Sequence, residues 1–389
     1  MTPLQGRDIV VVDEHQMDDE FERWLDVRKA NLKIVKTTKT PRGQILDWIP
    51  IESQAPTGTI ATPPKVAPVG DLGGARFEFD DPGFETGPAG TVPIVRPSSI
   101  PVKEKTKRGG LHIARRLYAR LHPERAPKDP NPFGYFHASE GQYTSVFGCD
   151  GFINVWDPAI NRPAGAEDDH SLMQLWLLNY GQPQVQSVEF GWTVDQSLNG
   201  NTSPCIFTYY TTNGYRQDGD NVGGYNARQK GWVQQSSKIF PGSILTQVST
   251  PGGQQAEIAF QIKLHENNWW VSVEGEMMGY YPAALFTGGN MGNGASWASF
   301  GGEVFSGLAN PTLTQNQMGS GRLPAAGANQ AAYMRNLRIQ TDAVGTMANS
   351  DGKPEKDSGN GGPLIYDIDM HLNSGTAWGS FIYIGGPAA

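Results

Sequence analysis

The sequence is short of several features, and each scarcity excludes a class of protein. No run approaches the roughly 20 consecutive apolar residues that a membrane-spanning helix needs, so we expect no membrane partner. There are only 2 cysteines, too few to hold a metal ion by themselves. Cys149 and Cys205 could form one disulfide if the protein is exported. The first residues lack a basic region followed by an apolar one, so no secretion signal is visible.

Familiar catalytic signatures are also missing. We find no G-x-S-x-G elbow, no H-E-x-x-H metal motif and no glycine-rich phosphate loop. The 7 histidines are scattered without the spacing of metal ligands, which favours surface or hydrogen-bonded roles. The sequence therefore predicts neither a metal nor a cofactor.

Basic residues are scarce in the second part of the chain. Residues 131–389 contain 11 Lys+Arg against 21 Asp+Glu, whereas residues 1–130 contain 20 and 18. A basic surface is the electrostatic requirement for binding nucleic acid. We therefore expect no nucleic-acid partner.

The first third of the chain predicts a small mixed unit followed by a linker. Residues 14–32 have acids in the first turns and bases in the last, which indicates a helix. Residues 42–51 alternate like a strand, and residues 54–102 are rich in Pro and Gly, which is typical of loop with short extended pieces. Residues 111–122 suggest a short amphipathic helix, and four prolines within 123–134 predict an exposed linker.

Beyond residue 134 the texture changes to many short strands. Runs rich in Val, Ile, Thr, Tyr, Phe and Trp alternate with Gly, Asn and Pro, as in "GFINVWDP", "VQSVEFGWTV" and "CIFTYYTT". Such a pattern indicates an antiparallel β-sandwich or barrel. The fold class predicted for the whole chain is mainly β, with a small α+β unit in front.

Carboxylates are the remaining candidates for catalysis. Alternation places Val188, Phe190 and Trp192 on one strand face and Glu189 on the other, and it separates Phe300 and Val304 from Glu303 in the same way. Both glutamates have glycine neighbours, which would leave room for a ligand backbone. The alternative is that they are ordinary glutamates on solvated faces. A rival pair is Glu274 and Glu276, two apart on an expected strand, which a glycan-active or glycan-binding sandwich could use.

Several stretches together resemble the neprosin family of glutamic peptidases. They include "VEFGWTV", "FTYYTTNGYRQ", "NNWWVSVEGEMMGYYPAALF", "GGEVF", "TQNQMGSGRLP" and the closing "YIGGP", in one order over about residues 135–389. "RGQILDWIPI" and "GTVPIVRP" are similar to the activation domain of the family's zymogens. The plant members carry two cysteines around the positions of Gly224 and Arg228 or Gln229, so this chain resembles a bacterial-type member.

The resemblance implies a function and a division of the chain. It implies a secreted endopeptidase without metal that cleaves peptide and protein substrates after proline at acid pH, with Glu189 and Glu303 as the catalytic pair. Residues 1–102 would be the intramolecular pro-domain, 103–134 the basic helix and linker with the processing site, and 135–389 the catalytic β-sandwich. Cleavage of the linker would follow one of its prolines, Pro123, Pro127, Pro130 or Pro132.

The remaining site residues follow from the chemistry expected of such a pair. Two carboxyl groups in one site would share a proton, one taking a proton from water and the other donating one. Stabilisation of the oxyanion would come from Gln317, Tyr215 or the backbone amides around Gly301 and Gly302. Aromatic residues could form a wall on which a proline ring stacks, although the sequence favours the core for each of them: Trp192, Trp269, Trp270, Tyr280 and Tyr281.

Overall fold

The computed structural model describes residues 14–55, 58–65, 74–97, 134–162, 168–180, 184–307, 315–357 and 365–387. Within these ranges, the structure contains no helix with the length and apolar character required to cross a membrane. The helix expected at 111–122, the linker up to residue 133 with its four prolines, and the basic run 103–128 lie outside the described residues.

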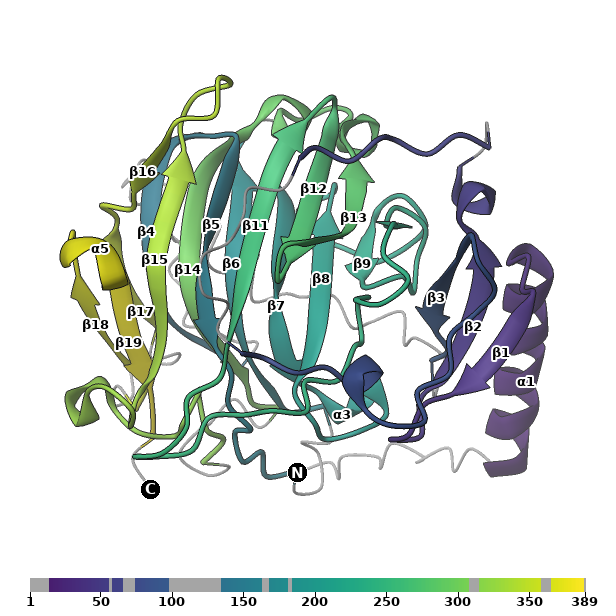
Figure 1. Cartoon of the computed structure of the whole chain (residues 1–389), viewed down its shortest axis with the longest axis horizontal. Helices are drawn as coiled ribbons and strands as arrows, with labels where there is room; N and C mark the ends of the chain where they lie inside the picture. Colours follow the sequence, from purple (N-terminus) through teal and green to yellow (C-terminus); the bar gives the residue numbers. More distant parts are fainter. Residues whose placement is uncertain are drawn as a thin grey trace, which may run out of the picture.

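The front part is a small α+β unit. It consists of helix α1 (Glu14–Asn31), strands β1 (Lys36–Lys39), β2 (Ile45–Pro50) and β3 (Thr91–Val95), and the short 3-10 helices η1 (Ile51–Gln54) and η2 (Glu78–Asp80). The strands form one antiparallel sheet in the order β1-β2-β3. The helix and the strand predicted here are therefore confirmed, and in Figure 1 this unit lies beside the large sheets.

Two large antiparallel sheets make up the rest of the described chain. The first has the order β17-β4-β14-β6-β7-β8-β9. Its strands are β4 (Tyr135–Val146), β6 (His170–Asn179), β7 (Gln186–Val194), β8 (Cys205–Thr211), β9 (Gly223–Tyr225), β14 (Ala295–Phe305) and β17 (Lys353–Asp357).

The second sheet has the order β10-β13-β12-β11-β5-β15-β19-β18, and β16 pairs with β15. Its strands are β5 (Gly148–Asn154), β10 (Val233–Gln234), β11 (Glu257–His265), β12 (Asn268–Val273), β13 (Glu276–Pro282), β15 (Ala332–Gln340), β16 (Met347–Asn349), β18 (Asp367–His371) and β19 (Phe381–Gly385). The predicted mainly β, antiparallel fold is confirmed.

Short helices occupy several connections between these strands. They are α3 (Gln196–Asn199), η4 (Ala283–Phe286), η5 (Met291–Asn293), η6 (Pro324–Ala326) and α5 (Gly375–Trp378). Of these, α3 follows β7 directly, and Asp195 caps it by accepting a hydrogen bond from the Leu198 amide at 2.9 Å. The cap fixes the Asp195 carboxylate at the end of β7.

The main hydrophobic core lies between the two large sheets (Figure 1). Inward-facing residues of the first sheet, such as Phe190, Trp192 and Phe300, pack with residues of the second, such as Phe260 and Val271. Because side chains alternate along a strand, every second residue of the first sheet points to its other face. That outward face carries the candidate site.

The front unit contacts the sandwich through apolar side chains and backbone groups. Leu46 and Trp48 of β2 pack on Phe240, and the Gln44 side chain donates to the Gly242 carbonyl at 2.9 Å. Further along, Glu78 donates its amide hydrogen to the Ile244 carbonyl at 3.0 Å. Phe77 is only 2% exposed and belongs to the main core of the sandwich. The front part thus contributes a side chain to the core itself.

Candidate active site

Glu189 lies on the outward face of β7, as its alternation with apolar residues predicts. Its side chain is 0% exposed, so the alternative of a solvated strand face is wrong. Oε1 accepts hydrogen bonds from the Ser187 hydroxyl at 2.9 Å and from the Tyr215 hydroxyl at 2.6 Å. Tyr215, predicted as a substrate-binding or oxyanion-binding residue, is therefore brought to a candidate catalytic carboxylate.

Tyr215 is held by several contacts on the loop after β8. Its φ of 60° is in the left-handed region, which bulky residues rarely adopt, and its amide donates to the Thr211 hydroxyl at 3.1 Å. Its ring lies parallel to that of Tyr209, with 5.9 Å between the centroids. Burial raises the pKa of Tyr215 well above its usual value, so its hydroxyl keeps its hydrogen and remains a donor.

Tyr209 extends this network to a further carboxyl group. Its hydroxyl donates to Asp218 Oδ1 at 2.9 Å. Burial raises the pKa of Asp218 to about 6, and the charge of Glu189 adds to this rise although the Tyr209 hydroxyl opposes it. Asp218 and Glu189 are therefore electrostatically linked through the tyrosine pair.

Glu303 lies on β14, which is paired on both sides, to β4 and to β6. It is also 0% exposed, so a solvated face is again excluded. Its Oε2 lies 2.9 Å from His137 Nε2, and its Oε1 lies 3.7 Å from His170 Nε2. Two imidazole rings from the neighbouring strands thus contact the two oxygens of one carboxylate.

His170 lies between two carboxylates. Its Nδ1 is 3.0 Å from the Asp168 carbonyl oxygen and 3.7 Å from Asp195 Oδ2. Burial lowers the pKa of His170, but its contacts with Glu303 and the charge of Asp195 outweigh burial and raise that pKa above the usual value. The imidazolium form is therefore favoured beside Glu303.

Both glutamates lie on one face of one sheet but are not neighbours. In the register of β14, β6 and β7, Glu303 lies in one row with Leu172 and Thr193. Glu189 lies in another row, with Trp176 and Ser299. Two strand spacings and four residues along the strand put the two Cα atoms on the order of 15 Å apart. The register places the row of Gly301, Gln174 and Gly191 between the two glutamates, and the proton shared by the two carboxyl groups stays a prediction.

The glycines beside the glutamates serve the packing of the sheet itself. A Cβ on Gly191 would meet the Met173 carbonyl oxygen at 2.0 Å, and one on Gly301 would meet the Ala138 carbonyl oxygen at 2.4 Å. They are small because neighbouring strands are close, and both lie in the row between the two glutamates, where room for a ligand backbone stays a prediction. Gly301 and Gly302 also lie inside β14, paired on both sides, where ladder hydrogen bonds rather than an oxyanion take up such amides.

The predicted aromatic wall is wrong. Trp192, Trp269 and Tyr281 are buried in the main core between the sheets. Trp270 and Tyr280 pack in a separate cluster with Ile60 and Ala61 of the front part. Gln317 is bound to Ala159, whose amide donates to its Oε1 at 2.9 Å, and is not brought to either glutamate. The sequence predicts these aromatic residues as substrate contacts because it shows that they are hydrophobic, but it does not show which face of the sandwich each side chain occupies.

Sequence reasoning missed the residues that surround the glutamates. His137 and His170 were grouped with the scattered histidines, although both contact Glu303. A second aromatic cluster shares the outward face and includes Trp176, Trp297 and Tyr209. Trp297 could have been found, because it is six residues before Glu303 on one strand and so has the same orientation. The histidines could not, because their strands are paired only in the fold.

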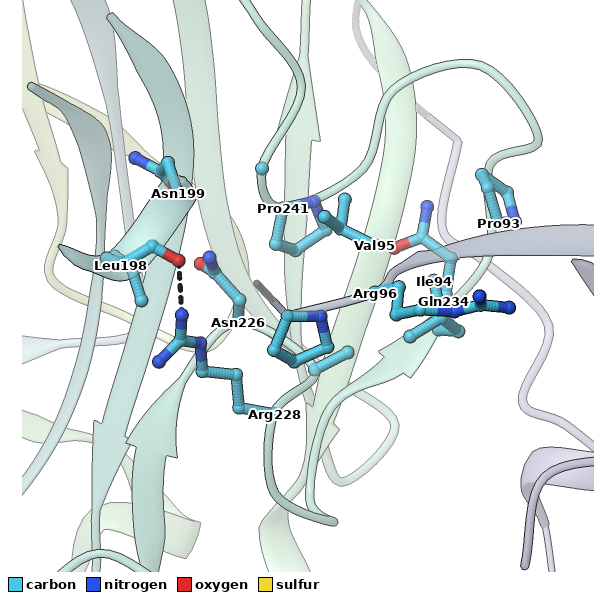
Figure 2. Close-up of a pocket in the computed structure, with 13 residues that line it drawn as sticks. Pro93, Ile94, Val95, Arg96, Leu198, Asn199, Asn226, Arg228, Gln234 and Pro241 are labelled. Atoms are coloured by element: carbon cyan, nitrogen blue, oxygen red, sulfur yellow. Dashed lines mark hydrogen bonds between the residues drawn. The ribbon is translucent and has the colours of Figure 1, made fainter. Parts of the chain in front are cut away.

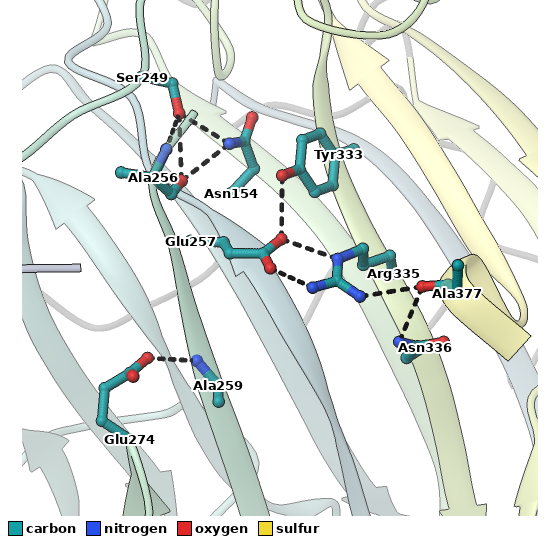
Figure 3. Close-up of polar contacts among 10 residues, drawn as sticks. All are labelled: Asn154, Ser249, Ala256, Glu257, Ala259, Glu274, Tyr333, Arg335, Asn336 and Ala377. Carbon is teal, nitrogen blue, oxygen red and sulfur yellow. Dashed lines mark hydrogen bonds and ion pairs between the residues drawn. The ribbon is translucent and has the colours of Figure 1, made fainter. Parts of the chain in front are cut away.

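The sequence also predicts the wrong arrangement for the rival pair, Glu274 and Glu276. Glu274 and Gly275 form the turn between β12 and β13, and Glu274 has a φ of 51°, so Glu274 and Glu276 do not share a strand face. Figure 3 shows Glu274 accepting a hydrogen bond from the Ala259 amide, at 2.7 Å, apart from the Glu257–Arg335 ion pair. Glu276 instead accepts from the Ser236 hydroxyl. The pair expected for a glycan-active site is not formed.

The cysteines are free, so the possible disulfide is wrong. Cys149 and Cys205 are both buried, one on β5 in the second sheet and the other on β8 in the first. In the described part of the chain, no group of three or more His, Cys, Asp or Glu is arranged to hold a metal ion.

Several solved structures resemble this chain at low sequence identity. SCP-B, a member of the Eqolisin family of peptidases solved with the tripeptide Ala-Ile-His, is 9% identical, with a TM-score of 0.33, covering 66% of this chain and 98% of that one. Scytalido-glutamic peptidase with a peptide-based transition-state analog is 10% identical, with the same TM-score and coverage. The apo Crh5 transglycosylase is 9% identical, with a TM-score of 0.25, covering 66% of this chain and 73% of that one.

These TM-scores are too low to support a conclusion about the chain. The family model described as Neprosin, by contrast, matches residues 167–387. Both candidate glutamates and Tyr215 fall inside the matched range. Because this match spans more than half of the sequence, the chain belongs to the neprosin family.

Proposed function

We propose that this chain is a secreted glutamic endopeptidase, made as a zymogen, that hydrolyses peptide bonds after proline at acid pH with Glu189 and Glu303. Membership of the family supports a peptidase of the glutamic type. The observation that carries the assignment of residues is that both glutamates are fully buried on one sheet face and held by side chains of that face. A buried carboxylate costs several kcal/mol unless it is paired or hydrogen-bonded, so such residues are rarely kept without a function.

The gap between the two carboxyl groups suits the chemistry. A water molecule and the peptide bond it attacks would occupy the space over β6 between them. One carboxylate takes a proton from that water, and the other carboxyl group donates one to the leaving nitrogen, each step contributing roughly 10²–10⁴ in rate. Tyr215 supplies a hydroxyl beside Glu189 for the oxyanion.

The same face offers an apolar surface for the substrate. Trp176, Trp297 and Tyr209 cluster there, between and beside the two glutamates. Rings of this kind give proline a flat surface on which to pack. These residues replace the wall expected from the sequence as the proposed contact for proline.

A zymogen is supported by the burial of the site. Because both carboxyl groups are inaccessible in the full chain, a peptide can reach them only after part of the chain moves. We propose that residues 1–102 are the pro-domain, 103–134 the processed linker and 135–389 the catalytic domain. Figure 2 shows a pocket where the front unit meets the sandwich. It is lined by Arg96 and Val95 of the front unit and by Asn226 and Pro241 of the sandwich.

The test is hydrolysis of a proline-containing fluorogenic peptide from pH 3 to 7 after acid treatment. We expect wild type to cleave it, and Glu189→Gln and Glu303→Gln to lose about 10²–10⁴ in kcat/KM. Glu276→Gln, on the second sheet, should retain wild-type activity. Near wild-type turnover of either site variant, with unchanged circular dichroism, would show that the catalytic pair is wrong. A matched peptide with alanine in place of proline tests the specificity.

A further inference from the structure

The surroundings of the two glutamates differ in charge, and this difference divides the work between them. Resting on the proposed function, we infer that His137 and His170 are positioning residues that keep Glu303 ionised, so that Glu303 is the base and Glu189 the acid. Neither histidine has to touch the substrate for this role.

Geometry on the Glu303 side favours a carboxylate. His137 reaches Oε2 at 2.9 Å and His170 lies 3.7 Å from Oε1, so one ring lies next to each oxygen. Asp195 lies 3.7 Å from the opposite nitrogen of His170. An imidazole between two carboxylates is stabilised in its charged form, and a cation within about 4–6 Å favours the ionised form of a carboxyl group.

Other ionisable groups surround this cluster from several strands. Tyr225 of β9 is close enough for the charge of Glu303 to raise its pKa after burial, and Tyr135 of β4 contacts the His170 ring with 6.2 Å between centroids. Asp169 accepts hydrogen bonds from Gly307 and Asn316 and also interacts electrostatically with His170, although burial gives Asp169 a net raised pKa. Arg228 interacts electrostatically with Asp195. Among these groups, the two histidines are the ones that lie against the carboxylate of Glu303.

The Glu189 side has a different character. The donors to its Oε1 are two neutral hydroxyl groups, from Ser187 and Tyr215. Asp218 accepts a hydrogen bond from Tyr209 at 2.9 Å, and the charge of Glu189 contributes to the raised pKa of Asp218. Hydroxyl groups can donate to a carboxylic acid as well as to a carboxylate, so these contacts accommodate the protonated form that an acid catalyst needs.

The two environments give one balanced step. Water loses a proton to Glu303 while its oxygen bonds to the carbonyl carbon of the substrate. Glu189 then gives its proton to the amide nitrogen, and the carbon–nitrogen bond breaks to release an acid and an amine. One water is consumed, and proton exchange with solvent restores the carboxylate on Glu303 and the carboxylic acid on Glu189.

The pH profile of the acid-treated enzyme tests the assignment. We compare kcat/KM from pH 2.5 to 7 for wild type, His170→Gln, His137→Gln and the control His371→Gln, whose ring pairs with Asp369 at 3.0 Å on β18. Removing a cation or a hydrogen-bond donor beside a carboxylate raises the pKa of that carboxyl group, so the acid limb of both site variants should move up by about 1 pH unit. The control should keep the wild-type profile.

Two results would overturn the inference. If Glu303 were the acid, replacing a histidine would raise the pKa of that acid and so move the alkaline limb of the profile. A shift of the alkaline limb would therefore reverse the two roles. An unmoved profile in both site variants would remove the positioning role. In the first case the wild type is still an active peptidase, so only the assignment of the acid and the base fails. An inactive wild type would instead count against the proposed function.

A measurement without turnover covers variants that fail to fold or an inactive wild type. NMR titration of ¹⁵N-labelled histidine rings is carried out on full-length Glu303→Gln and Glu189→Gln proteins. The midpoint of His170 should fall by about 1 pH unit in the first, because it loses an anionic neighbour, and stay unchanged in the second. Equal midpoints in the two proteins would show that His170 and Glu303 are not coupled.

Discussion

The Tyr215 hydroxyl donates to Glu189 Oε1 over 2.6 Å from a backbone with a φ of 60°. Left-handed conformations in bulky residues cost about 1–3 kcal/mol and persist where other contacts hold them. Here the Thr211 hydroxyl accepts the Tyr215 amide, and the Tyr209 ring stacks on its side chain. Several groups therefore maintain a costly conformation that places one hydroxyl on a buried carboxyl group.

Replacing Tyr215 by Phe should reduce activity beyond the loss of stability that removal of any buried hydrogen bond entails. A hydrogen bond to a charged or buried carboxyl group is worth about 1.5–3 kcal/mol, so kcat/KM should fall by about 10- to 100-fold. The matched control is Tyr333→Phe, which removes a 2.9 Å hydrogen bond to Glu257 on the second sheet and should leave kcat/KM unchanged. Equal activity of the two variants would argue against a role of Tyr215 in the reaction.

Glu140 should make the protein more stable in acid. Burial raises its pKa to about 8, partly opposed by the Ser350 hydroxyl, which donates to it at 2.7 Å. The folded state therefore binds a proton that the unfolded state releases above about pH 4.5, and each pH unit from there to pH 8 lowers the free energy of unfolding by roughly 1 kcal/mol. The stabilisation is complete below pH 4.5 and is lost as the pH rises.

Urea unfolding at pH 4.5, 6 and 7.5 checks this for Glu140→Gln. The variant keeps an acceptor for Ser350 but cannot ionise, so its stability should depend less on pH than that of wild type. Glu266→Gln, on the exposed turn after β11, serves as the control with wild-type behaviour. A slope unchanged by Glu140→Gln would assign the pH dependence to other groups.

The sequence predicted what depends on a single strand and failed where strands must be paired. Alternation alone predicts that Glu189 and Phe190 point to different faces of β7, and that Glu303 and Val304 point to different faces of β14. The structure has both arrangements. The contact between Glu303 and His137 joins residues 166 apart. It exists only because β4 and β14 pair in one register, which no local pattern specifies.

Other errors had local causes. Glu274 was read as a strand residue because it continues the alternation of "VSVEGE", yet the chain turns there at Glu274 and Gly275. The sequence predicts Trp192 as a cleft residue because an aromatic residue near a catalytic glutamate is compatible with either the cleft or the core. Trp192 follows Glu189 by three residues, an odd number, so its side chain points to the opposite face of the strand and into the core.

Both cysteines should be present as unreactive thiols. Burial raises the pKa of Cys149 well above its usual value, and it also raises that of Cys205. Because the thiolate is the reactive form, a thiol reagent at pH 8 should label neither in the folded protein. Denaturation without reductant should expose the 2 thiols, and a count of zero would instead indicate a disulfide.

Maturation should occur in the linker. A post-proline enzyme can cut "PERAPKDPNPFG" after Pro123, Pro127, Pro130 or Pro132. N-terminal sequencing of acid-treated wild type should find one of these new ends, whereas Glu303→Gln should remain uncut. An upstream end, or equal cleavage of the inactive variant, would mean that another protease is responsible.

The front part should stay bound after the linker is cut, because its hold on the sandwich is largely apolar. Phe77 is buried in the main core, and on either side of it Arg76 and Glu78 exchange backbone hydrogen bonds with Thr246 and Ile244. The nine Lys+Arg of residues 103–128 suggest the alternative, an electrostatic strap on the acidic domain. Ion pairs weaken with salt, with a screening length of about 3 Å at 1 M, whereas burial of a phenylalanine does not.

The two mechanisms can be separated in the inactive Glu303→Gln protein after an added protease has cut the linker. We expect the front fragment to co-elute with the catalytic domain in 1 M NaCl at pH 7, because salt leaves the Phe77 contact intact. Adding Phe77→Ala should release it, since truncating a buried phenylalanine costs about 3–5 kcal/mol. The control Lys36→Ala, which removes an exposed ion pair with Glu85 inside the front unit, should not. Release by salt alone, with Phe77 in place, would show that charge rather than apolar burial holds the zymogen closed.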